Sequence, residues 1–354
     1  MRRLARALAV TLALATLALV MGCGSTGPGT SPGSSENAAG KPPALTYTFT
    51  SLTPAGGSAS AFAMADDETV FGSRGGVPCV WPAPARATNV GLLDTGGMGS
   101  GAVRSCNAAG TVAVGSVGGQ PCQWSRAGSA WGPCKLLDQT GVHDLEVRPF
   151  VNSRGQIVSG FWFWASADTP PVKLPVESAH AISEDGLIAA SRDNRPVVCV
   201  PDDPISPTSW TVQELAVPGA DPNAVLVGHA YGINNCGQVV GLGAPGGSHP
   251  FLWTTTDSGW TATDLGLPKT GIWGQAMAIN DQGLVVAFVY SSSGRQGTDN
   301  AYVWRNGAWI DLKTASGAPY PLGFPYDISS NGVICGTCDI PKSANDAAYT
   351  LTPR

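Results

Sequence analysis

The sequence predicts an all-β fold: a β-propeller of about seven four-stranded blades, closed by an N-terminal strand that pairs into the last blade. Three observations predict it. Only 13% of the 354 residues are charged, whereas 46 are glycine and 28 are proline, and this composition favours short strands and turns over helices. One motif recurs along the chain every 31 to 51 residues, a period typical of propeller blades. The last copy lacks one strand, and the residues before the first copy supply a spare.

The clearest copy of the motif runs from Ala230 to Gly241, reads AYGINNCGQVVG, and is followed by HPFLW and TDL. A second clear copy begins at Ala276, and weaker copies cover the rest of the chain. One turn position marks every copy, occupied by Glu68, Gly110, Gly155, Gly186, Gly237, Gly283 and Gly332. A tryptophan marks five copies, at Trp81, Trp124, Trp164, Trp253 and Trp304. Because this tryptophan recurs in the third strand of each copy, we expect it to fill the core between blades rather than to bind a sugar.

Each copy predicts four short antiparallel strands. In the copy that begins at Ala276, the expected strands cover residues 276–280, 284–289, 301–305 and 308–312. Gly283 and the pair Asn306-Gly307 lie in the turns, since glycine and asparagine tolerate the positive φ of a tight hairpin. The interval from Gly155 to Gly186 holds only 31 residues, which leaves three or four strands open for that blade.

The two ends of the repeat region predict how the ring closes. The seventh copy ends at Arg354 after its third strand, residues 348–352, and has no fourth strand. Residues Tyr47 to Leu52 precede the first copy and resemble a fourth strand. Pairing of this segment into the last blade removes the exposed edges that an open array would present. We therefore predict seven blades, with six or eight as the alternatives.

These elements resemble the extracellular HAF repeat family, whose motif reads approximately A-x-x-I-N-x-x-G-x-V-V-G, followed by H-A-F-L-W and D-L-G. Residues 230–241, 249–253 and 264–266 match it, as do residues 276–286 and 301–304. Outside residues 224–335 the match is partial. The resemblance implies a propeller-like domain on an exported bacterial protein, and it implies no particular reaction.

The N-terminus predicts export and a lipid anchor. Residues 1–22 combine three arginines with an uncharged run from Leu8 to Met21, which suits a signal peptide and is too short to span a bilayer. Val20-Met21-Gly22-Cys23 resembles the lipobox of bacterial lipoproteins, which implies lipidation of Cys23 and, with Gly24 in place of Asp, a location at the outer membrane or cell surface. Residues 23–44 then form the lipidated cysteine and a flexible Gly/Ser/Pro tether. Residues 45–354 form the repeat domain.

Charge and motifs exclude several function classes. A net charge of −5 argues against nucleic-acid binding, which needs clustered Lys and Arg. The sequence contains no nucleophile elbow, P-loop, zinc-protease motif or calcium loop. We therefore predict no catalytic residue, no cofactor and no metal, and we expect a monomer.

Eight cysteines remain besides Cys23, an even set that suggests disulfides in an exported protein. Cys122 and Cys134 fall on neighbouring strands of the second copy and form one candidate pair. Cys335 and Cys338 form a C-x-x-C. Because this pair lies in strand and loop rather than at a helix N-terminus, a local disulfide or two buried thiols explain it better than a redox pair.

Strand direction predicts where a ligand binds. In antiparallel blades the turns after the first and third strands lie on one face, the turn face, and the loops after the second and fourth strands lie on the other, the loop face. The loop face carries the variable segments, and binding residues tend to lie on such loops. The candidate ligand residues are His143, Asp144, Arg192, Arg195, His229, His249 and Trp273.

Together these features predict a lipid-anchored module of the cell envelope that binds a glycan or a protein partner without catalysis. Two alternatives remain open. A polysaccharide lyase or hydrolase needs carboxylates or a Tyr/His pair that converge on one face. An assembly scaffold needs a broad apolar interface.

Overall fold

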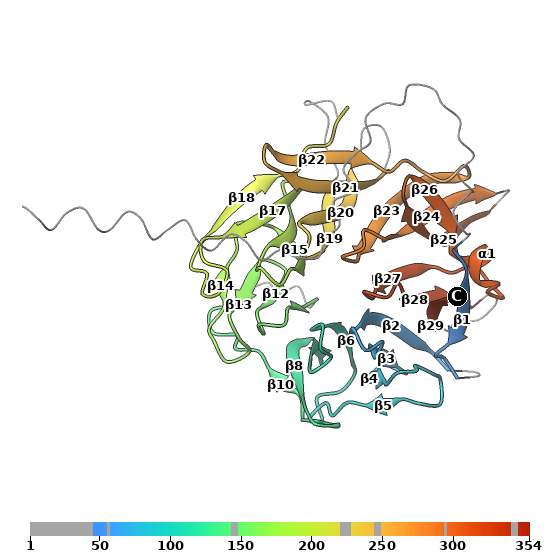
Figure 1. Ribbon diagram of the computed structural model, residues 1–354. Coiled ribbons are helices and arrows are strands. Elements are labelled where there is room, and N and C mark those ends of the chain that lie inside the picture. Colours follow the sequence, from blue (N-terminus) through green and yellow to red (C-terminus); the bar gives the residue numbers. More distant parts are fainter. Residues whose placement is uncertain are drawn as a thin grey trace, which may run out of the picture. The chain divides into compact units, whose positions relative to one another are not determined.

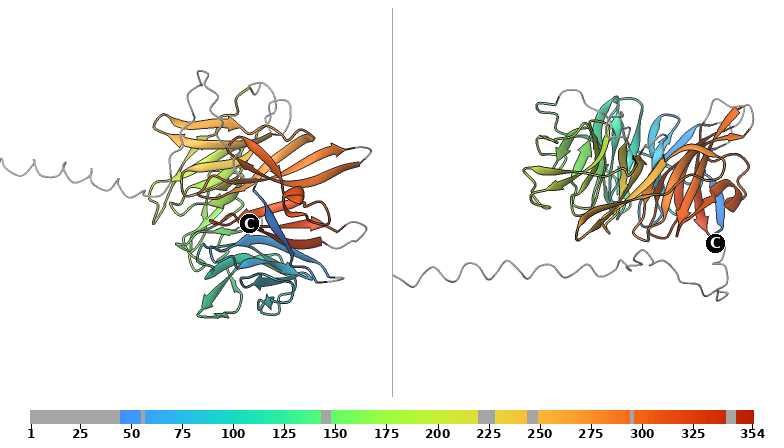
Figure 2. Two further views of the ribbon diagram at one scale, coloured as in Figure 1. Left: turned by 45° about the vertical axis from the view of Figure 1, so that its right-hand side comes forward. Right: turned by 90° about the horizontal axis from the view of Figure 1, so that it is seen from above.

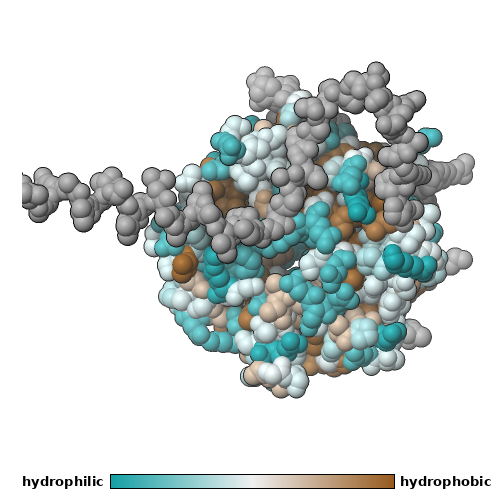
Figure 3. All heavy atoms as spheres, in the orientation of Figure 1, coloured by the Kyte–Doolittle hydropathy of each residue, from teal (hydrophilic) through white to brown (hydrophobic). Residues whose placement is uncertain are grey.

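The repeats form seven antiparallel sheets arranged in a ring, as Figure 1 shows for the computed structural model. The structure describes residues 45–54, 57–142, 148–219, 228–243, 249–293, 296–340 and 346–354. The right-hand view of Figure 2 shows the ring from its edge, with the blades side by side. Figure 3 shows hydrophilic residues gathered around the centre of one face. The all-β, seven-bladed propeller that the sequence predicts is confirmed.

Within each blade the strands run in order from the axis to the rim. Blade 1 comprises β2 (Ala59–Met64), β3 (Val70–Arg74), β4 (Val77–Trp81) and β5 (Gly91–Leu92). Blade 2 comprises β6 (Gly101–Cys106), β7 (Val112–Val117), β8 (Gln120–Ala127) and β10 (Lys135–Leu136), with β9 (Ala130–Trp131) also paired to β8. Blade 3 comprises β11 (Phe150–Val151), β12 (Ile157–Ser159), β13 (Trp162–Trp164) and β14 (Val172–Lys173). Blade 4 comprises β15 (Ser178–Ile182), β16 (Ile188–Arg192), β17 (Arg195–Pro201) and β18 (Trp210–Glu214).

The remaining three blades follow the same plan. Blade 5 comprises β19 (His229–Ile233), β20 (Gln238–Gly243), β21 (His249–Thr256) and β22 (Gly259–Asp264). Blade 6 comprises β23 (Gly271–Ile279), β24 (Val285–Ser293), β25 (Gln296–Arg305) and β26 (Ala308–Asp311). Blade 7 comprises β27 (Phe324–Ile328), β28 (Ile334–Asp339), β29 (Asp346–Pro353) and β1 (Tyr47–Ser51).

The ring closes through β1, which pairs antiparallel with β29 from Tyr47 opposite Pro353 to Ser51 opposite Tyr349. Two backbone hydrogen bonds extend the pairing at its ends, from Leu52 N–H to the Ala348 carbonyl (2.8 Å) and from Arg354 N–H to the Thr46 carbonyl (2.9 Å). Both ends of the repeat region therefore lie in one blade, and the predicted closure is confirmed.

Two local features were left open or not predicted by the sequence. Blade 3 has four strands, and they fit its short interval because each is only two or three residues long. Blade 6 is followed by a short helix, α1 (Leu312–Ser316), which the repeat pattern did not predict. The Asp311 carboxylate caps it by accepting a hydrogen bond from Thr314 N–H, and Gly317 ends it in the left-handed conformation.

The repeated tryptophans pack between blades, as expected. Trp81, Trp124, Trp164 and Trp253 are completely buried, and Trp304 is half-buried. Three of them also tie their blade to the preceding one. The indole N–H groups of Trp124, Trp164 and Trp253 donate to the carbonyls of Asp94, Asp138 and Ala216, at 2.8, 2.7 and 2.7 Å.

A second inter-blade contact explains the I-N-x-x-G motif. The amide groups of Asn152, Asn234 and Asn280 donate to the carbonyls of Ser183, Asn280 and Ser329, which occupy the same position in the next blade, at 3.0, 3.0 and 2.9 Å. Each amide oxygen meanwhile accepts N–H groups of its own turn.

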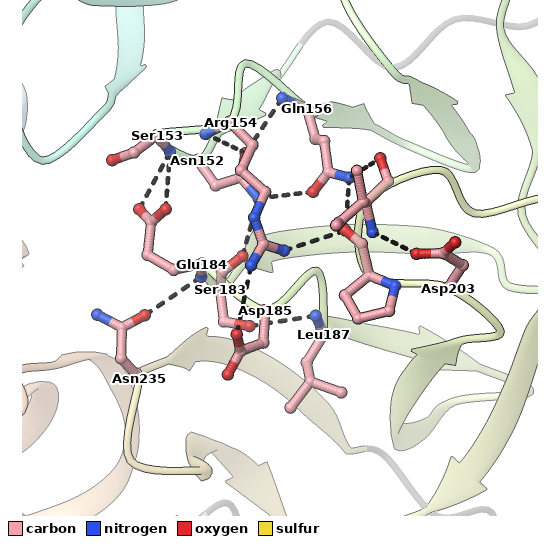
Figure 4. Close-up of polar contacts among 12 residues, drawn as sticks. Asn152, Ser153, Arg154, Gln156, Ser183, Glu184, Asp185, Leu187, Asp203 and Asn235 are labelled. Atoms are coloured by element: carbon pink, nitrogen blue, oxygen red, sulfur yellow. Dashed lines mark hydrogen bonds and ion pairs between the residues drawn. The ribbon is translucent and has the colours of Figure 1, made fainter. Parts of the chain in front are cut away.

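Backbone groups of the same turns continue the contact around the ring. Ser153 N–H donates to the Glu184 carboxylate, and Glu184 N–H donates to the Asn235 amide oxygen. Figure 4 shows both bonds, with Asn152 beside Gln156 and Arg154 beside Asp185. The asparagine of the I-N-x-x-G motif therefore contributes to the contact between successive blades.

Residues 1–44 are not among the described residues. The predicted signal peptide, Cys23 and the tether therefore stay predictions. In the described part of the chain, no helix has the length and apolar character needed to cross a membrane.

The turn position after each first strand has a positive φ in all seven blades. Six blades have glycine there, with φ between 61° and 80°, and Glu68 adopts φ 66° in blade 1. A residue with a side chain is strained in this conformation.

We expect Glu68→Gly to raise the free energy of unfolding by about 0.5–1 kcal/mol, because relief of left-handed strain exceeds the added freedom of the unfolded chain. Gly155→Ala is the matched control: φ is 77° and the added methyl meets open space, so it should lower stability by about 1 kcal/mol. Urea unfolding checks both. Destabilisation by Glu68→Gly would contradict the argument.

Candidate functional site

The first strands of the seven blades surround a central cavity of about 260 Å³. Six of these strands contain a β-bulge, at which the pairing register shifts by one residue. Such a bulge re-aims a side chain. The residues at the bulges are Phe62, Arg104, His180, Tyr231, Met277 and Tyr326, and all six line the cavity. We call them the channel layer.

From the channel layer the cavity extends toward the turn face. Its next lining residues are mainly apolar: Met64, Cys106, Val151, Ile182, Ile233, Ile279 and Ile328. At its turn-face end lie Asp66, Glu184 and Asp281. The two ends of the channel therefore differ in chemistry, with acidic turns at one end and aromatic, imidazole and guanidinium groups at the other.

Arg104 supplies the guanidinium group of the channel layer. Its guanidinium lies over the Phe62 ring, 4.1 Å from the centroid, and its buried Nε has no hydrogen-bond partner. Burial lowers the pKa of Arg104, and the charge of Arg148 lowers it further. Exposed Arg148 precedes β11 and also acts on the pKa of His180, Tyr231 and Tyr326. Among the described residues neither arginine has a carboxylate at ion-pair distance.

Two histidines and a tyrosine meet beside these arginines. The His180 ring lies 5.2 Å from that of Tyr231 and 6.0 Å from that of His229, and His229 stacks on Tyr231 at 5.6 Å. Burial lowers the pKa of His180 to about 4, and the charges of His229 and Arg148 add to the effect. Burial also lowers the pKa of His229. Both imidazoles are therefore neutral at pH 7, and each can donate and accept a hydrogen bond.

Two polar atoms of this group are buried without a partner, Nε of Arg104 and Nδ1 of His229. Buried polar atoms are normally hydrogen-bonded, and exceptions call for an explanation such as a bound molecule.

The predicted ligand residues divide into three sets. His143 and Asp144 lie outside the described residues. Arg192 and Arg195 flank the tight hairpin between β16 and β17, where Arg192 lies 3.8 Å from Glu214, and His249 lies 2.9 Å from Asp264. His229 and Trp273 are linked by ring contacts to the channel layer. None of the five described residues of this set lines the cavity, and the role of all seven in binding stays a prediction.

The sequence did not single out the channel layer, although it contained a usable signal. Arg104, His180, Tyr231 and Tyr326 each lie six residues before the turn residue of their blade. Strand alternation alone does not show that this position faces the axis, because the bulge that turns it inward is visible only in the pairing register.

The structure describes the four cysteines of the candidate disulfides. Cys335 and Cys338 are both buried thiols, and they pack in different core clusters, Cys335 against blade 1 and Cys338 within the blade 6–7 core. Residues i and i+3 of a strand face opposite sides, which agrees with the alternative of two buried thiols. Cys122 and Cys134 are thiols in hydrogen-bond contact, and their disulfide stays a prediction. In the described part of the chain no three His, Cys, Asp or Glu side chains gather as a metal site would require.

Comparison with known proteins identifies the architecture but no family. No family model matches the chain, and no curated protein sequence matches it. Among solved structures, the extracellular domain of the two-component system BT4673 from B. thetaiotaomicron superposes with a TM-score of 0.54 at 9% identity, over 87% of this chain and 40% of that one. The chain thus spans about two fifths of that protein's length. The protein is a seven-bladed β-propeller similar to bacterial extracellular propeller domains.

Two further structures are more distant. A polysaccharide lyase of family PL25, an ulvan lyase, gives a TM-score of 0.42 at 11% identity, over 68% of this chain and 77% of that one. PorZ, a surface component of the type-IX secretion system of Porphyromonas gingivalis, gives 0.30 at 10% identity, over 82% and 46%. Neither score supports an argument about function.

One carboxylate of the channel wall has a structural role. Asp327 is half-buried in β27 and accepts hydrogen bonds from Met64 N–H of blade 1 and from its neighbour Ile328 N–H, both at 2.8 Å. Burial raises the pKa of Asp327 to about 6, against the opposing effect of these hydrogen bonds. Asp327 therefore links blade 7 to blade 1. Its burial makes ionisation of the carboxyl group less favourable.

A raised folded-state pKa means that the Asp327 contribution to stability is fully present below pH 4 and is lost as the pH rises through 6. We expect the stability difference between the wild type and Asp327→Asn to shift against the wild type by about 2–3 kcal/mol between pH 4 and pH 7. Chemical denaturation at several pH values measures it. The exposed turn variant Asp257→Asn is the control, and a pH-independent difference for Asp327→Asn would refute the assignment.

Proposed function

We propose that this propeller is a binding module for an anionic glycan, which enters from the loop face and places its acidic group at Arg104 and Arg148. The observation that carries the proposal is Arg104, which lines the cavity and whose buried Nε has no hydrogen-bond partner. The charge of Arg148 lowers its pKa, and neither arginine has a carboxylate at ion-pair distance among the described residues. Like charges held close together repel. An anion between them removes that repulsion and forms charge-assisted hydrogen bonds.

The neighbours of the arginines suit a sugar. Neutral His180 and His229 offer donors and acceptors for hydroxyl groups, and Tyr231 and Tyr326 add phenol groups whose pKa burial raises. Phe62 and the tyrosines supply apolar surface. Such a mixture of a few polar groups with aromatic walls is typical of small-ligand sites.

The setting of this site is part of the proposal. Lipidation of Cys23 would hold the monomeric propeller at the outer membrane or cell surface, on the flexible tether of residues 24–44. A ring tethered in this way can retain a glycan, or an envelope protein that carries one. The alternative is that the anchored propeller acts as a scaffold that joins envelope proteins.

A second candidate is a polysaccharide lyase, favoured by the contact of His180 with Tyr231 beside two arginines. An arginine would neutralise a uronate carboxylate and so acidify the C5 proton. A neutral imidazole would take that proton, and the C5–H electron pair would form the C4–C5 double bond. The C4–O bond would break, with its oxygen protonated by Tyr231. A hydrolase is less favoured, because it uses two carboxylates. The carboxylates of Asp66, Glu184 and Asp281 lie at the turn-face end of the cavity, away from the proposed site, and Asp327 accepts backbone N–H groups.

We expect full-length protein to bind at least one of galacturonan, alginate and chondroitin sulfate in calorimetric titration, with affinity that falls as salt rises. Arg148→Ala should weaken binding at least tenfold, as expected for loss of a charge-assisted hydrogen bond. Arg86→Ala, an exposed arginine of blade 1, is the matched control, and Arg195→Ala tests the predicted hairpin.

Three outcomes decide between the candidates. Binding without new chain ends supports the module. Accumulation of unsaturated sugar ends, abolished by His180→Ala, replaces it with the lyase. Absence of binding to all three polymers, or equal binding by wild type and Arg148→Ala, overturns the arginine site.

A further inference from the structure

A continuous series of aromatic contacts leads from the channel layer to the loop face of blade 6. Arg104 lies on Phe62, and Phe62 contacts Tyr326 with ring centroids 5.0 Å apart. The series continues from Tyr326 to Phe324 (5.9 Å), Phe288 (4.2 Å) and Trp273 (5.1 Å), and ends on Tyr290 (6.1 Å).

The outer end of this series is exposed. Trp273 keeps 36% of its surface accessible, and its neighbour Ile272 keeps 50%. The blade-marking tryptophans Trp81, Trp124, Trp164 and Trp253 are instead fully buried. Trp273 therefore differs from the core tryptophans in exposure. Two rings contact it, Tyr290 stacked at 22° and Phe288 tilted at 56°.

Blade 6 is built to present this residue. Its first three strands have nine, nine and ten residues, longer than those of the other blades, and Figure 2 shows them projecting from the ring. β23 has a register shift between Gly271 and Trp273, in addition to the one at Met277. A bulge at this place re-aims the side chains before the strand enters the channel.

We infer that Trp273, supported by Tyr290 and Phe288, is a second subsite that stacks against the apolar face of a sugar ring. This inference rests on the proposed function and makes it more specific. The ligand is a polymer of acidic sugars that binds along its chain, with one unit at Arg104 and Arg148 and another unit over Trp273. A rigid, half-exposed indole suits this role because it offers a large flat surface at small cost in conformational entropy.

The test compares chain lengths. For the polymer retained in the titration above, we expect its hexasaccharide to bind the wild type at least tenfold more tightly than its monosaccharide. Trp273→Ala should weaken hexasaccharide binding about tenfold and leave monosaccharide binding unchanged, whereas Trp273→Phe should retain part of the gain. Trp260→Ala, a partly exposed tryptophan on the outer strand of blade 5, is the matched control, and thermal melts of all variants verify folding.

The outcomes separate this inference from the proposed function. If Arg148→Ala weakens both ligands while Trp273→Ala weakens neither, the arginine site stands and the stacking subsite is refuted. If Trp273→Ala weakens monosaccharide and hexasaccharide equally, Trp273 belongs to the same subsite and the inference is also refuted. If a hexasaccharide with its carboxylates reduced to alcohols binds the wild type and loses that binding in Trp273→Ala, the stacking subsite stands while the anion site fails.

Discussion

The hydrogen bond that an asparagine in the first turn of blades 3, 5 and 6 donates to the next blade is the contact from which the arrangement of these blades follows. Asn234 shows it most clearly: its amide oxygen holds its own turn, and its amide nitrogen donates to the Asn280 carbonyl of the following blade. A backbone carbonyl buried between sheets is costly to leave unpaired. The asparagine therefore fixes the spacing of blades at the channel, while the buried tryptophans fix it farther out.

This spacing explains why the channel can carry chemistry. The asparagine and tryptophan contacts hold the blades together. The side chains that face the axis are therefore not needed to close the core. The bulges then turn one large side chain per blade inward in six blades. Arg104, His180, Tyr231 and Tyr326 come from blades far apart in sequence and converge only because the ring is closed.

The two faces of the ring offer different surfaces. Toward the turn face, carboxylates such as Glu184 and Asp281 accept backbone N–H groups of the neighbouring blade, so they serve the architecture. Toward the loop face, Arg104 and Arg148 have no carboxylate at ion-pair distance among the described residues. Trp273 is partly exposed. This difference between the two faces is the reason the proposal assigns the ligand to the loop face.

The sequence by itself determined the number of blades, the strand order within each, and the closure by Tyr47 to Leu52, because the period and the turn glycines are local properties of the chain. It also identified the tryptophans as core and the loop face as the variable one. Only the tertiary structure decided which side chains meet at the axis, that blade 3 keeps four strands, and that Cys335 and Cys338 face opposite ways. The reason is physical: register shifts and ring closure bring together residues more than a hundred positions apart, and no local pattern encodes such distances.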